Sequence, residues 1–270
     1  GNLIEAEKYY QYFINEGYSD PSVFSNYGII LKDMGKLKEA DLLTRKAIEQ
    51  KPSFSDAHYN HGIILDKLGR FKESELAYRK AIELKPTFSE AYLNLGSLIK
   101  NHGQLNEAKK LIQKAIEFNP DLIEAHLNLG IILKDLGNFK EAEISTRKAL
   151  DLNIGFFEAH YNLGNIFMAL GKLIEAEKSY RKTIELNPKF SKAHMNLGLI
   201  CADLGKLKEA ECSTRKAIEL NPELPEAYSN LGSILVYSDK LKESEQLIRK
   251  AIELKPDLVE AYYNLASLLL

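Results

Sequence analysis

The sequence is poor in several residue types on which common functional sites depend. Its 270 residues include no tryptophan, three methionines and only two cysteines, Cys201 and Cys212. Neither cysteine has CxxC or other metal-ligand spacing, which excludes a disulfide framework and a cysteine-based zinc site. This cysteine usage fits a reducing compartment, and we predict a cytoplasmic protein.

Long apolar runs and an excess of one charge are also missing. No stretch is long and apolar enough to cross a bilayer, and no signal sequence follows Gly1, although a segment upstream of Gly1 would escape notice. The 36 basic and 38 acidic residues leave a formal net charge of −2. We therefore expect neither a nucleic-acid nor a membrane partner.

Internal repetition is what the sequence has in abundance. Stretches such as 89–122, 191–224 and 225–258 align with one another at a period of 34 residues, without insertion or deletion. Residues 1–20 match the second half of one repeat, and residues 259–270 match the first half of another. The seven full repeats are 21–54, 55–88, 89–122, 123–156, 157–190, 191–224 and 225–258.

Each repeat has the pattern of two amphipathic helices. When its positions are numbered 1 to 34, apolar or small residues fall at 4, 7, 8 and 11, then at 17, 20, 24, 27 and 28. Glycine at position 15 and proline at position 32 are typical of helix ends. Glycine at position 8 and Ala or Ser at position 20 allow the two helices to approach closely as an antiparallel pair. Since one pair cannot bury its apolar stripe alone, the fold is predicted to be an all-α stack of pairs.

The full set of positions resembles the tetratricopeptide repeat (TPR) family over the whole chain. The resemblance rests on an aromatic residue or His at 4, Leu at 7, Gly at 8, Ala at 20 and 27, and Pro at 32. It implies a right-handed superhelical solenoid whose first helices line a concave groove, and a non-catalytic scaffold that binds extended peptide segments. Similar bacterial arrays are joined to transferases, so the alternative is a substrate-recruiting arm of a larger enzyme.

Position 6 is asparagine in every copy, on the side of the first helix opposite its apolar stripe. Asparagine costs roughly 0.6 kcal/mol relative to alanine inside a helix, so an unbroken column calls for a reason. The column is similar to the Asn ladder in the TPR arm of O-linked N-acetylglucosamine transferase, which implies amides that pair with a peptide backbone. The alternative is that each amide bonds only to the adjacent repeat. The column comprises Asn26, Asn60, Asn94, Asn128, Asn162, Asn196, Asn230 and Asn264.

Positions 12 and 13 become more apolar along the chain. Met168, Val236 and Tyr237 are the best candidates for peptide anchors, with ordinary packing as the alternative. Acidic residues at positions 2 and 13 favour a basic or polar peptide, although an acid in the first turn also complements the helix dipole. These acids include Glu158, Asp203, Glu226 and Glu260.

Two further patterns point away from site chemistry. Histidine fills position 4 in four repeats, but adjacent helices lie roughly 8–10 Å apart, too far for neighbouring rungs to share an ion. We therefore interpret His58, His126, His160 and His194 as core residues. The carboxylates lie on exposed faces and Cys201 occupies core position 11, so we predict no enzyme activity, no metal and no cofactor.

The two half-repeats suggest self-association. Residues 1–20 lack a first helix, residues 259–270 lack a second one, and both carry apolar side chains such as Tyr9, Tyr10 and Leu268 to Leu270. Joined head to tail between molecules, they would make a nearly complete repeat. We therefore expect end-to-end homo-oligomers at high concentration.

Overall fold

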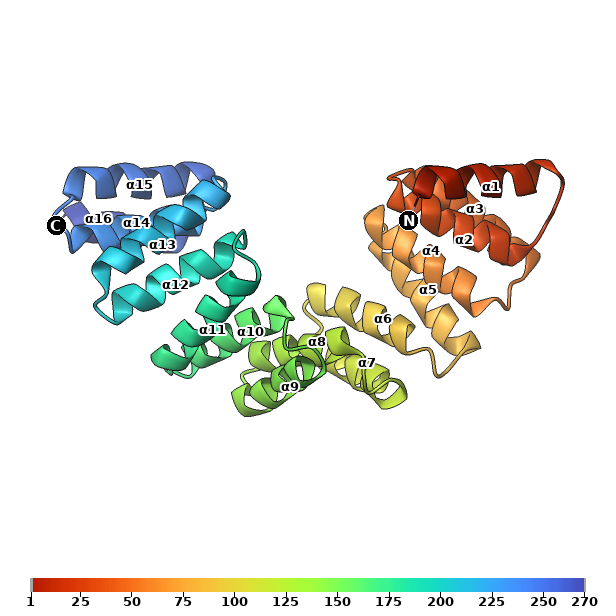
Figure 1. Cartoon of the computed structure of the whole chain (residues 1–270), viewed down its shortest axis with the longest axis horizontal. Coiled ribbons are helices and arrows are strands. Elements are labelled where there is room, and N and C mark those ends of the chain that lie inside the picture. Colours follow the sequence, from red (N-terminus) through yellow and green to blue (C-terminus); the bar gives the residue numbers. More distant parts are fainter. Residues whose placement is uncertain (1, 270) are drawn as a thin grey trace. The chain divides into compact units, whose positions relative to one another are not determined.

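The computed structural model describes residues 2–269, and over this range it contains helices and no strand. The described residues form sixteen helices joined by short turns, and Figure 1 labels them in chain order. The first helices of the repeats are α2 (Pro21–Asp33), α4 (Ser55–Lys67), α6 (Ser89–Asn101), α8 (Ile123–Asp135), α10 (Phe157–Ala169), α12 (Ser191–Asp203), α14 (Pro225–Val236) and α16 (Val259–Leu269). The second helices are α1 (Leu3–Asn15), α3 (Leu37–Gln50), α5 (Phe71–Leu84), α7 (Leu105–Phe118), α9 (Phe139–Leu152), α11 (Leu173–Leu186), α13 (Leu207–Leu220) and α15 (Leu241–Leu254).

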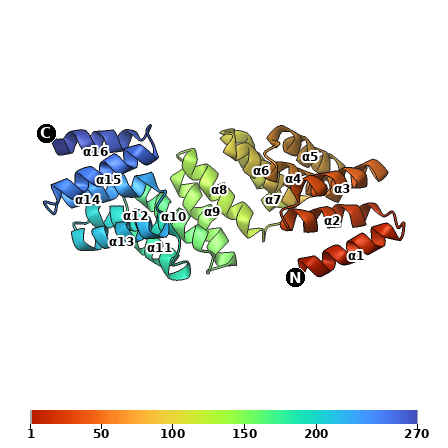
Figure 2. The same ribbon diagram turned by 90° about the horizontal axis from the view of Figure 1, so that it is seen from above.

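The helices form two compact halves. The N-terminal half runs to Leu136 and holds α1 to α8, and the C-terminal half starts at Gly137 and holds α9 to α16. Within each half, every helix packs against its neighbours in the chain, and consecutive first helices such as α2 and α4 or α12 and α14 also touch. Figure 2 shows this neighbour-to-neighbour packing from above. Residues at positions 3, 20 and 27 are fully buried alanines in most repeats, so small side chains set the close packing.

Glycine ends most of the first helices, as predicted. Gly69 and Gly205, for example, have φ angles of 73° and 74°, in the left-handed region where only glycine is free of steric cost. In the seventh repeat the equivalent residue is Asp239, at φ 56°. There α14 ends at Val236, one repeat position earlier than the other full first helices.

The glycine at position 8 leaves no room for a side chain. A Cβ atom on Gly164 would lie 2.5 Å from Cε1 of Tyr180, and one on Gly232 would lie 2.5 Å from Cγ1 of Ile248. Both partner residues lie on the second helix of the same repeat. The close approach predicted from glycine is therefore the contact that closes these helix pairs.

The histidines at position 4 differ from the core role assigned to them. Only His126 is buried, and the other three are half-buried. Each Nε2 atom lies 2.7–2.9 Å from the backbone oxygen six residues earlier, which belongs to the turn between repeats. Tyr262 donates from its hydroxyl to Pro256 in the same way, at 3.0 Å. Position 4 therefore fixes the inter-repeat turn by a hydrogen bond, and this bond also pairs the imidazole of the buried His126.

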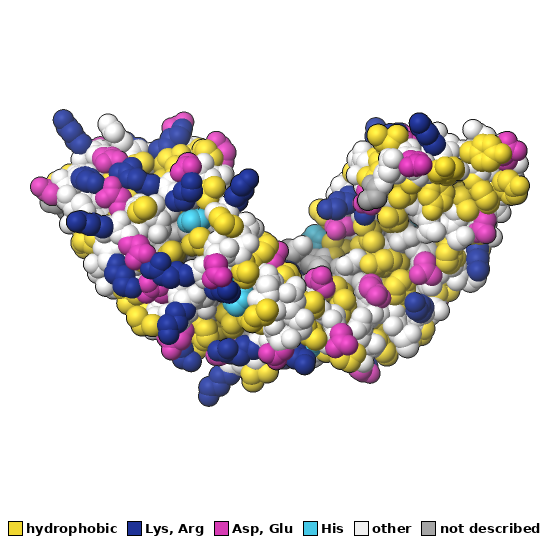
Figure 3. Space-filling view, viewed as in Figure 1, with side chains coloured by type: hydrophobic (Ala, Val, Ile, Leu, Met, Phe, Trp, Pro, Cys, Tyr) yellow, Lys and Arg dark blue, Asp and Glu magenta, His cyan; other side chains and the backbone are white. Residues whose placement is uncertain are grey.

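The outer surface of the second helices carries two kinds of ion pair. Six second helices have an acid four residues before an arginine, and all six of these pairs are formed. The same side chains also reach the next repeat: Glu177 contacts Lys206 at 2.7 Å, and Arg215 contacts Glu243 at 2.7 Å. Figure 3 shows the two charges interspersed over the visible face of the C-terminal half. These pairs thus join neighbouring repeats as well as stabilising single helices.

Candidate protein-binding surface

The predicted site residues share one surface of the first helices. We call this the first-helix face and define it by positions 2, 5, 6, 9, 12 and 13 of the repeats within each half. The second helices cover the opposite side through positions 4, 7, 8 and 11. The first-helix face therefore carries the asparagine column and the three anchor candidates.

Most of the asparagine side chains donate a hydrogen bond to the preceding repeat. In three cases the hydroxyl group at position 5 of that repeat is the one acceptor among the described residues. Asn60 donates to Ser25 at 2.9 Å, Asn94 to Tyr59 at 3.1 Å, and Asn264 to Ser229 at 3.0 Å. The amide nitrogen thus ties consecutive first helices together.

When position 5 is leucine, another residue supplies the hydroxyl. Leu93 occupies position 5 of the third repeat, and Asn128 donates instead to Ser97 at position 9, at 3.0 Å. Leu127 occupies it in the fourth repeat, and Asn162 donates to Thr146 at position 24, at 2.8 Å. Since both hydroxyls already donate to backbone oxygens, they can only accept from the amides.

Asn196 lies in the most extensive of these networks. Its amide nitrogen is 3.1 Å from the Asn165 oxygen, 3.2 Å from the Tyr161 hydroxyl and 3.3 Å from the Tyr180 hydroxyl. Burial raises the pKa of the Tyr161 and Tyr180 hydroxyls, so both stay neutral and able to accept. The network joins three helices, α10, α11 and α12.

Asn26 and Asn230 make no side-chain hydrogen bond within the described residues of their halves. Asn26 is exposed, and Asn230 follows a repeat whose positions 5 and 9 are Met195 and Leu199, which offer no hydroxyl. In each bonded case a hydroxyl at position 5, 9 or 24 of the preceding repeat accepts, but its presence is not sufficient, because Asn230 does not bond to Thr214 at position 24 of its preceding repeat. The sequence indicates the adjacent repeat as the alternative partner of these amides, without identifying the hydroxyl groups that accept from them.

The contacts described above involve the amide nitrogens of the asparagine column and not the amide oxygens. None of them accepts a hydrogen bond within its own half. Among residues 2–269, no buried side-chain oxygen lacks a partner, so these oxygens reach solvent. The column therefore uses its amide nitrogens for stacking between repeats.

Two of the three anchor candidates meet in one pocket of the C-terminal half. Val236 and Tyr237 line a pocket of about 300 Å³ together with Asn264. Their exposed fractions are 39% and 73%, so both are open to a partner. The remaining lining residues are Ser233, Tyr263, Ser267 and Leu268. Met168 is 36% exposed and lies outside this pocket.

One cluster in the C-terminal half has residue types that bind metals. Ligand atoms of Glu177, Cys201 and Glu209 lie within 4.8 Å of one another. Both carboxylates, however, already pair with Arg181, and Glu177 also pairs with Lys206. Burial raises the pKa of the Cys201 thiol to about 11, which keeps it protonated. The cluster is a stacking contact between repeats.

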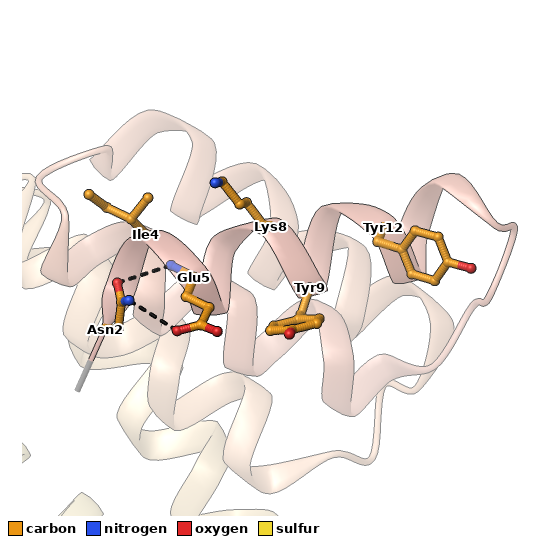
Figure 4. Close-up of a pocket in the computed structure, with 6 residues that line it drawn as sticks. All are labelled: Asn2, Ile4, Glu5, Lys8, Tyr9 and Tyr12. Atoms are coloured by element: carbon orange, nitrogen blue, oxygen red, sulfur yellow. Dashed lines mark hydrogen bonds between the residues drawn. The ribbon is translucent and has the colours of Figure 1, made fainter.

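A larger hollow, of about 660 Å³, lies on α1. As Figure 4 shows, its six lining side chains all come from α1 and the residue that caps it, among them Tyr9 and Tyr12. No second element closes the hollow, so it is an open surface on which Ile4 and two tyrosines alternate with Asn2, Glu5 and Lys8. In the described part of the chain, no helix has the length and apolarity needed to cross a bilayer.

Comparison with solved structures shows what this fold is similar to. A chain of the APC/C hetero-tetramer Cut9-Hcn1 aligns with 99% of this chain at a TM-score of 0.80 and 15% identity, and this chain spans 53% of its length. A tetratricopeptide repeat protein from Parabacteroides merdae aligns with 93% of this chain and 99% of its own length, at a TM-score of 0.72 and 18% identity. At these identities the likeness concerns the fold alone.

A third solved structure is closer in sequence. YrrB, described as a TPR protein with an unusual peptide-binding site, is 26% identical over 69% of this chain and 96% of its own, at a TM-score of 0.54. None of the curated protein sequences compared with this chain matches it.

Family models give the direct sequence match. Models described as tetratricopeptide repeat match residues 55–88, 77–110, 111–144, 157–190, 191–224 and 225–258. These segments cover well over half of the chain, and four of them have the bounds of predicted repeats. The chain therefore belongs to the tetratricopeptide repeat family.

Proposed function

We propose that the chain is a non-catalytic scaffold that binds extended segments of partner proteins on its first-helix face. The observation that carries the proposal is the pocket formed by Val236, Tyr237 and Asn264. It combines exposed apolar surface with an amide, and exposed aromatic side chains are frequent anchors at protein interfaces. The two unpaired cysteine thiols favour a reducing compartment, and we propose the cytoplasm.

The alanine series suggested by the asparagine column is a poor test of this function. Replacing Asn128, Asn162 or Asn196 removes hydrogen bonds that stack the repeats, so lost binding and lost structure would coincide. The pocket offers cleaner positions because Val236 and Tyr237 are exposed.

The test is affinity capture from a lysate of the source organism, read by mass spectrometry, with the native chain and a Val236→Ala/Tyr237→Ala variant. We expect a defined set of proteins to be depleted about tenfold in the variant, the effect of losing one aromatic anchor. Ile144→Ala is the matched control, because Ile144 is 68% exposed on α9 in the same half but lies off the first-helix face. Retention of all captured proteins by the double variant would contradict the proposal.

A second candidate function is self-association through α1 and α16. Ile4, Tyr9 and Tyr12 are 62–68% exposed on α1, where Figure 3 shows apolar side chains gathered, and Val259 and Leu269 are 73% and 62% exposed on α16. One helix is of the second type and the other of the first, so α16 of one copy can pair with α1 of another. Gly1 and Leu270, also part of this hypothesis, lie outside the described residues.

Light scattering over a wide concentration range tests this candidate. We expect the mean mass to rise with concentration, and Tyr12→Glu to abolish the rise because it puts a charge in the contact. A constant monomeric mass in the native chain would rule it out.

A further inference from the structure

Consecutive first helices do not approach one another equally. Within the two halves, the contact is most extensive between α2 and α4, followed by α14 and α16, α12 and α14, and α6 and α8. Among the described residues it is at most marginal between α4 and α6 and between α10 and α12. From α3 onward, by contrast, each second helix contacts the following first helix to a similar extent. Successive repeats therefore differ mainly in how far their first helices stand apart.

The size of the residue at position 5 follows the same order. This residue faces the next repeat, because its hydroxyl group, where it has one, accepts from the next asparagine. It is serine in the two closest pairs, a medium-sized apolar residue in the two intermediate pairs, and tyrosine in the two pairs that hardly touch. In the order of the pairs given above, the residues are Ser25, Ser229, Met195, Leu93, Tyr59 and Tyr161.

Position 9 of the same helices does not show this order. The large Ile29 lies on α2, which belongs to the closest pair, whereas the small Ser97 lies on α6, which belongs to a looser one. Asn165, also at position 9, lies on α10 in one of the most open pairs. A large side chain at position 9 therefore does not separate the helices, and the relation is specific to position 5.

Aromatic side chains hold both tyrosines in place. Each packs against an aromatic residue at position 24 and another at position 34 of its own repeat. The ring centroid of Tyr161 lies 5.8 Å from that of Tyr180 and 5.0 Å from that of Phe190. That of Tyr59 lies 6.0 Å from Tyr78 and 4.8 Å from Phe88. No other full repeat has aromatic residues at positions 5, 24 and 34 together. A ring packed on two sides cannot turn away from the next helix without opening a void.

The hydrogen bond to the next repeat is kept across the wider gap. Asn196 lies 3.2 Å from the Tyr161 hydroxyl, and Asn60 makes the corresponding bond to Ser25 at 2.9 Å. The serine hydroxyl is attached to Cβ, whereas the tyrosine hydroxyl lies beyond a whole ring. The same bond therefore joins helices that stand farther apart when position 5 is tyrosine.

We propose that Tyr59 and Tyr161 are spacers that hold α4 apart from α6 and α10 apart from α12. The residue at position 5 thereby sets the local curvature of the array within each half. Ser25 and Ser229 close the first-helix face, and each tyrosine opens it at one place in its half. The inference concerns the geometry of this face and names no partner, so its test does not depend on the proposed function.

The test measures the distance between two spin labels on the full chain by double electron–electron resonance. The labels replace Ala169 at the end of α10 and Asp203 at the end of α12, which are both exposed and both at position 13. The exposed Cys212 is replaced by serine, and Cys201 is buried. We expect Tyr161→Ser to shorten the distance by about 2 Å, the range over which the contacting side chains change the spacing of packed helices.

Two further variants show whether the size of the side chain is the cause. Tyr161→Leu, which matches Leu93 of the third repeat, should shorten the distance by less than Tyr161→Ser and keeps an apolar side chain in the contact. Tyr161→Phe keeps the ring and removes the hydroxyl group, so the distance should stay as in the native chain. Shortening by Tyr161→Phe equal to that by Tyr161→Ser would overturn the inference, because the hydrogen bond would then set the spacing.

A second pair of labels provides the matched control. Asp203 and Tyr237 are both exposed at position 13 of α12 and α14, and their distance should not change in Tyr161→Ser. The reverse substitution, Ser25→Tyr, should lengthen the distance between labels at Asp33 and Lys67, the exposed position 13 residues of α2 and α4. Circular dichroism checks that each variant keeps the native helix content. An unchanged Ala169–Asp203 distance in both Tyr161→Ser and Tyr161→Leu would overturn the inference.

Discussion

At the scale of the residue, the asparagines of one column differ in the hydrogen bonds that they make. The amide nitrogen of Asn196 lies within hydrogen-bonding distance of three acceptors in a buried network, whereas Asn230, in the same register one repeat later, donates to none within its half. Two asparagines at the same repeat position can therefore contribute very differently to stability.

Alanine substitutions should separate the two roles. Asn196→Ala removes the donor that faces the Tyr161 and Tyr180 hydroxyls, so we expect a loss of about 1–3 kcal/mol in the free energy of unfolding. Asn230→Ala should change it by less than about 0.5 kcal/mol. Urea unfolding followed by circular dichroism measures both, and equal losses would show that burial, and not the hydrogen bonds, sets the cost.

A second residue-scale prediction concerns the end of α14. Asp239 holds a left-handed φ of 56° at the position where other repeats have glycine. Asp239→Gly should raise the free energy of unfolding by about 0.5–1 kcal/mol, because glycine adopts this conformation without a Cβ clash. Gly205→Asp, the reverse change one repeat earlier, should lower it by a similar amount. A lower thermal midpoint for Asp239→Gly would contradict this account.

At the scale of the element, ion pairs couple helices of successive repeats. Glu177 on α11 is 7% exposed and is bound by Lys206 at the start of α13 and by Arg181 on its own helix. The hydrogen bonds from Lys206 and Arg181 lower the pKa of this carboxyl group. Its contribution to stability is therefore present above the unfolded pKa of about 4.3 and is lost as the pH falls through the lower folded value.

The corresponding experiment compares thermal midpoints between neutral and acidic pH. Glu177→Gln should lower the midpoint at neutral pH and lose part of the acid-induced decrease, because the substituted amide does not titrate. Glu185→Gln is the control, since Glu185 is exposed on the same helix and pairs only with Lys182. If the thermal midpoints of both variants depend on pH in the same way, Glu177 does not couple the helices.

Element bounds were predictable from the sequence, and contacts between elements were much less so. Gly69 and Gly205 mark helix ends because their conformation depends on one residue and its neighbours in the chain. The acceptor of Asn162, by contrast, lies sixteen residues away on another helix and differs from that of Asn60. The pocket at Tyr237 needs Tyr263 and Ser267 of the next repeat, which only stacking brings near. Position 4 was misassigned because hydrophobic spacing cannot show a hydrogen bond to a backbone oxygen.

At the scale of the whole molecule, contacts within each half join only neighbouring repeats. Local damage should therefore spread only a short way along the chain. Gly232→Ala places a methyl group against Ile248 and should cost about 1–3 kcal/mol.

Hydrogen exchange measured by mass spectrometry shows which helices are destabilised in the Gly232→Ala variant. We expect α14, α15 and α16 to lose protection while α10 and α11 keep theirs, and Gly28→Ala to produce the mirrored result around α2 and α3. Uniform loss of protection over all helices would mean that the chain opens as one cooperative body.

The hydroxyl that accepts from each bonded asparagine belongs to the preceding repeat, and this constrains how such a chain can be rearranged. Duplicating the repeat 157–190, which offers Tyr161, Asn165 and Tyr180, would supply acceptors to whatever repeat followed it. Inserting further copies of 191–224 would leave each following amide in the situation of Asn230. Repeats that share one consensus are therefore not interchangeable, because the order of the copies decides whether each asparagine finds an acceptor in the preceding repeat.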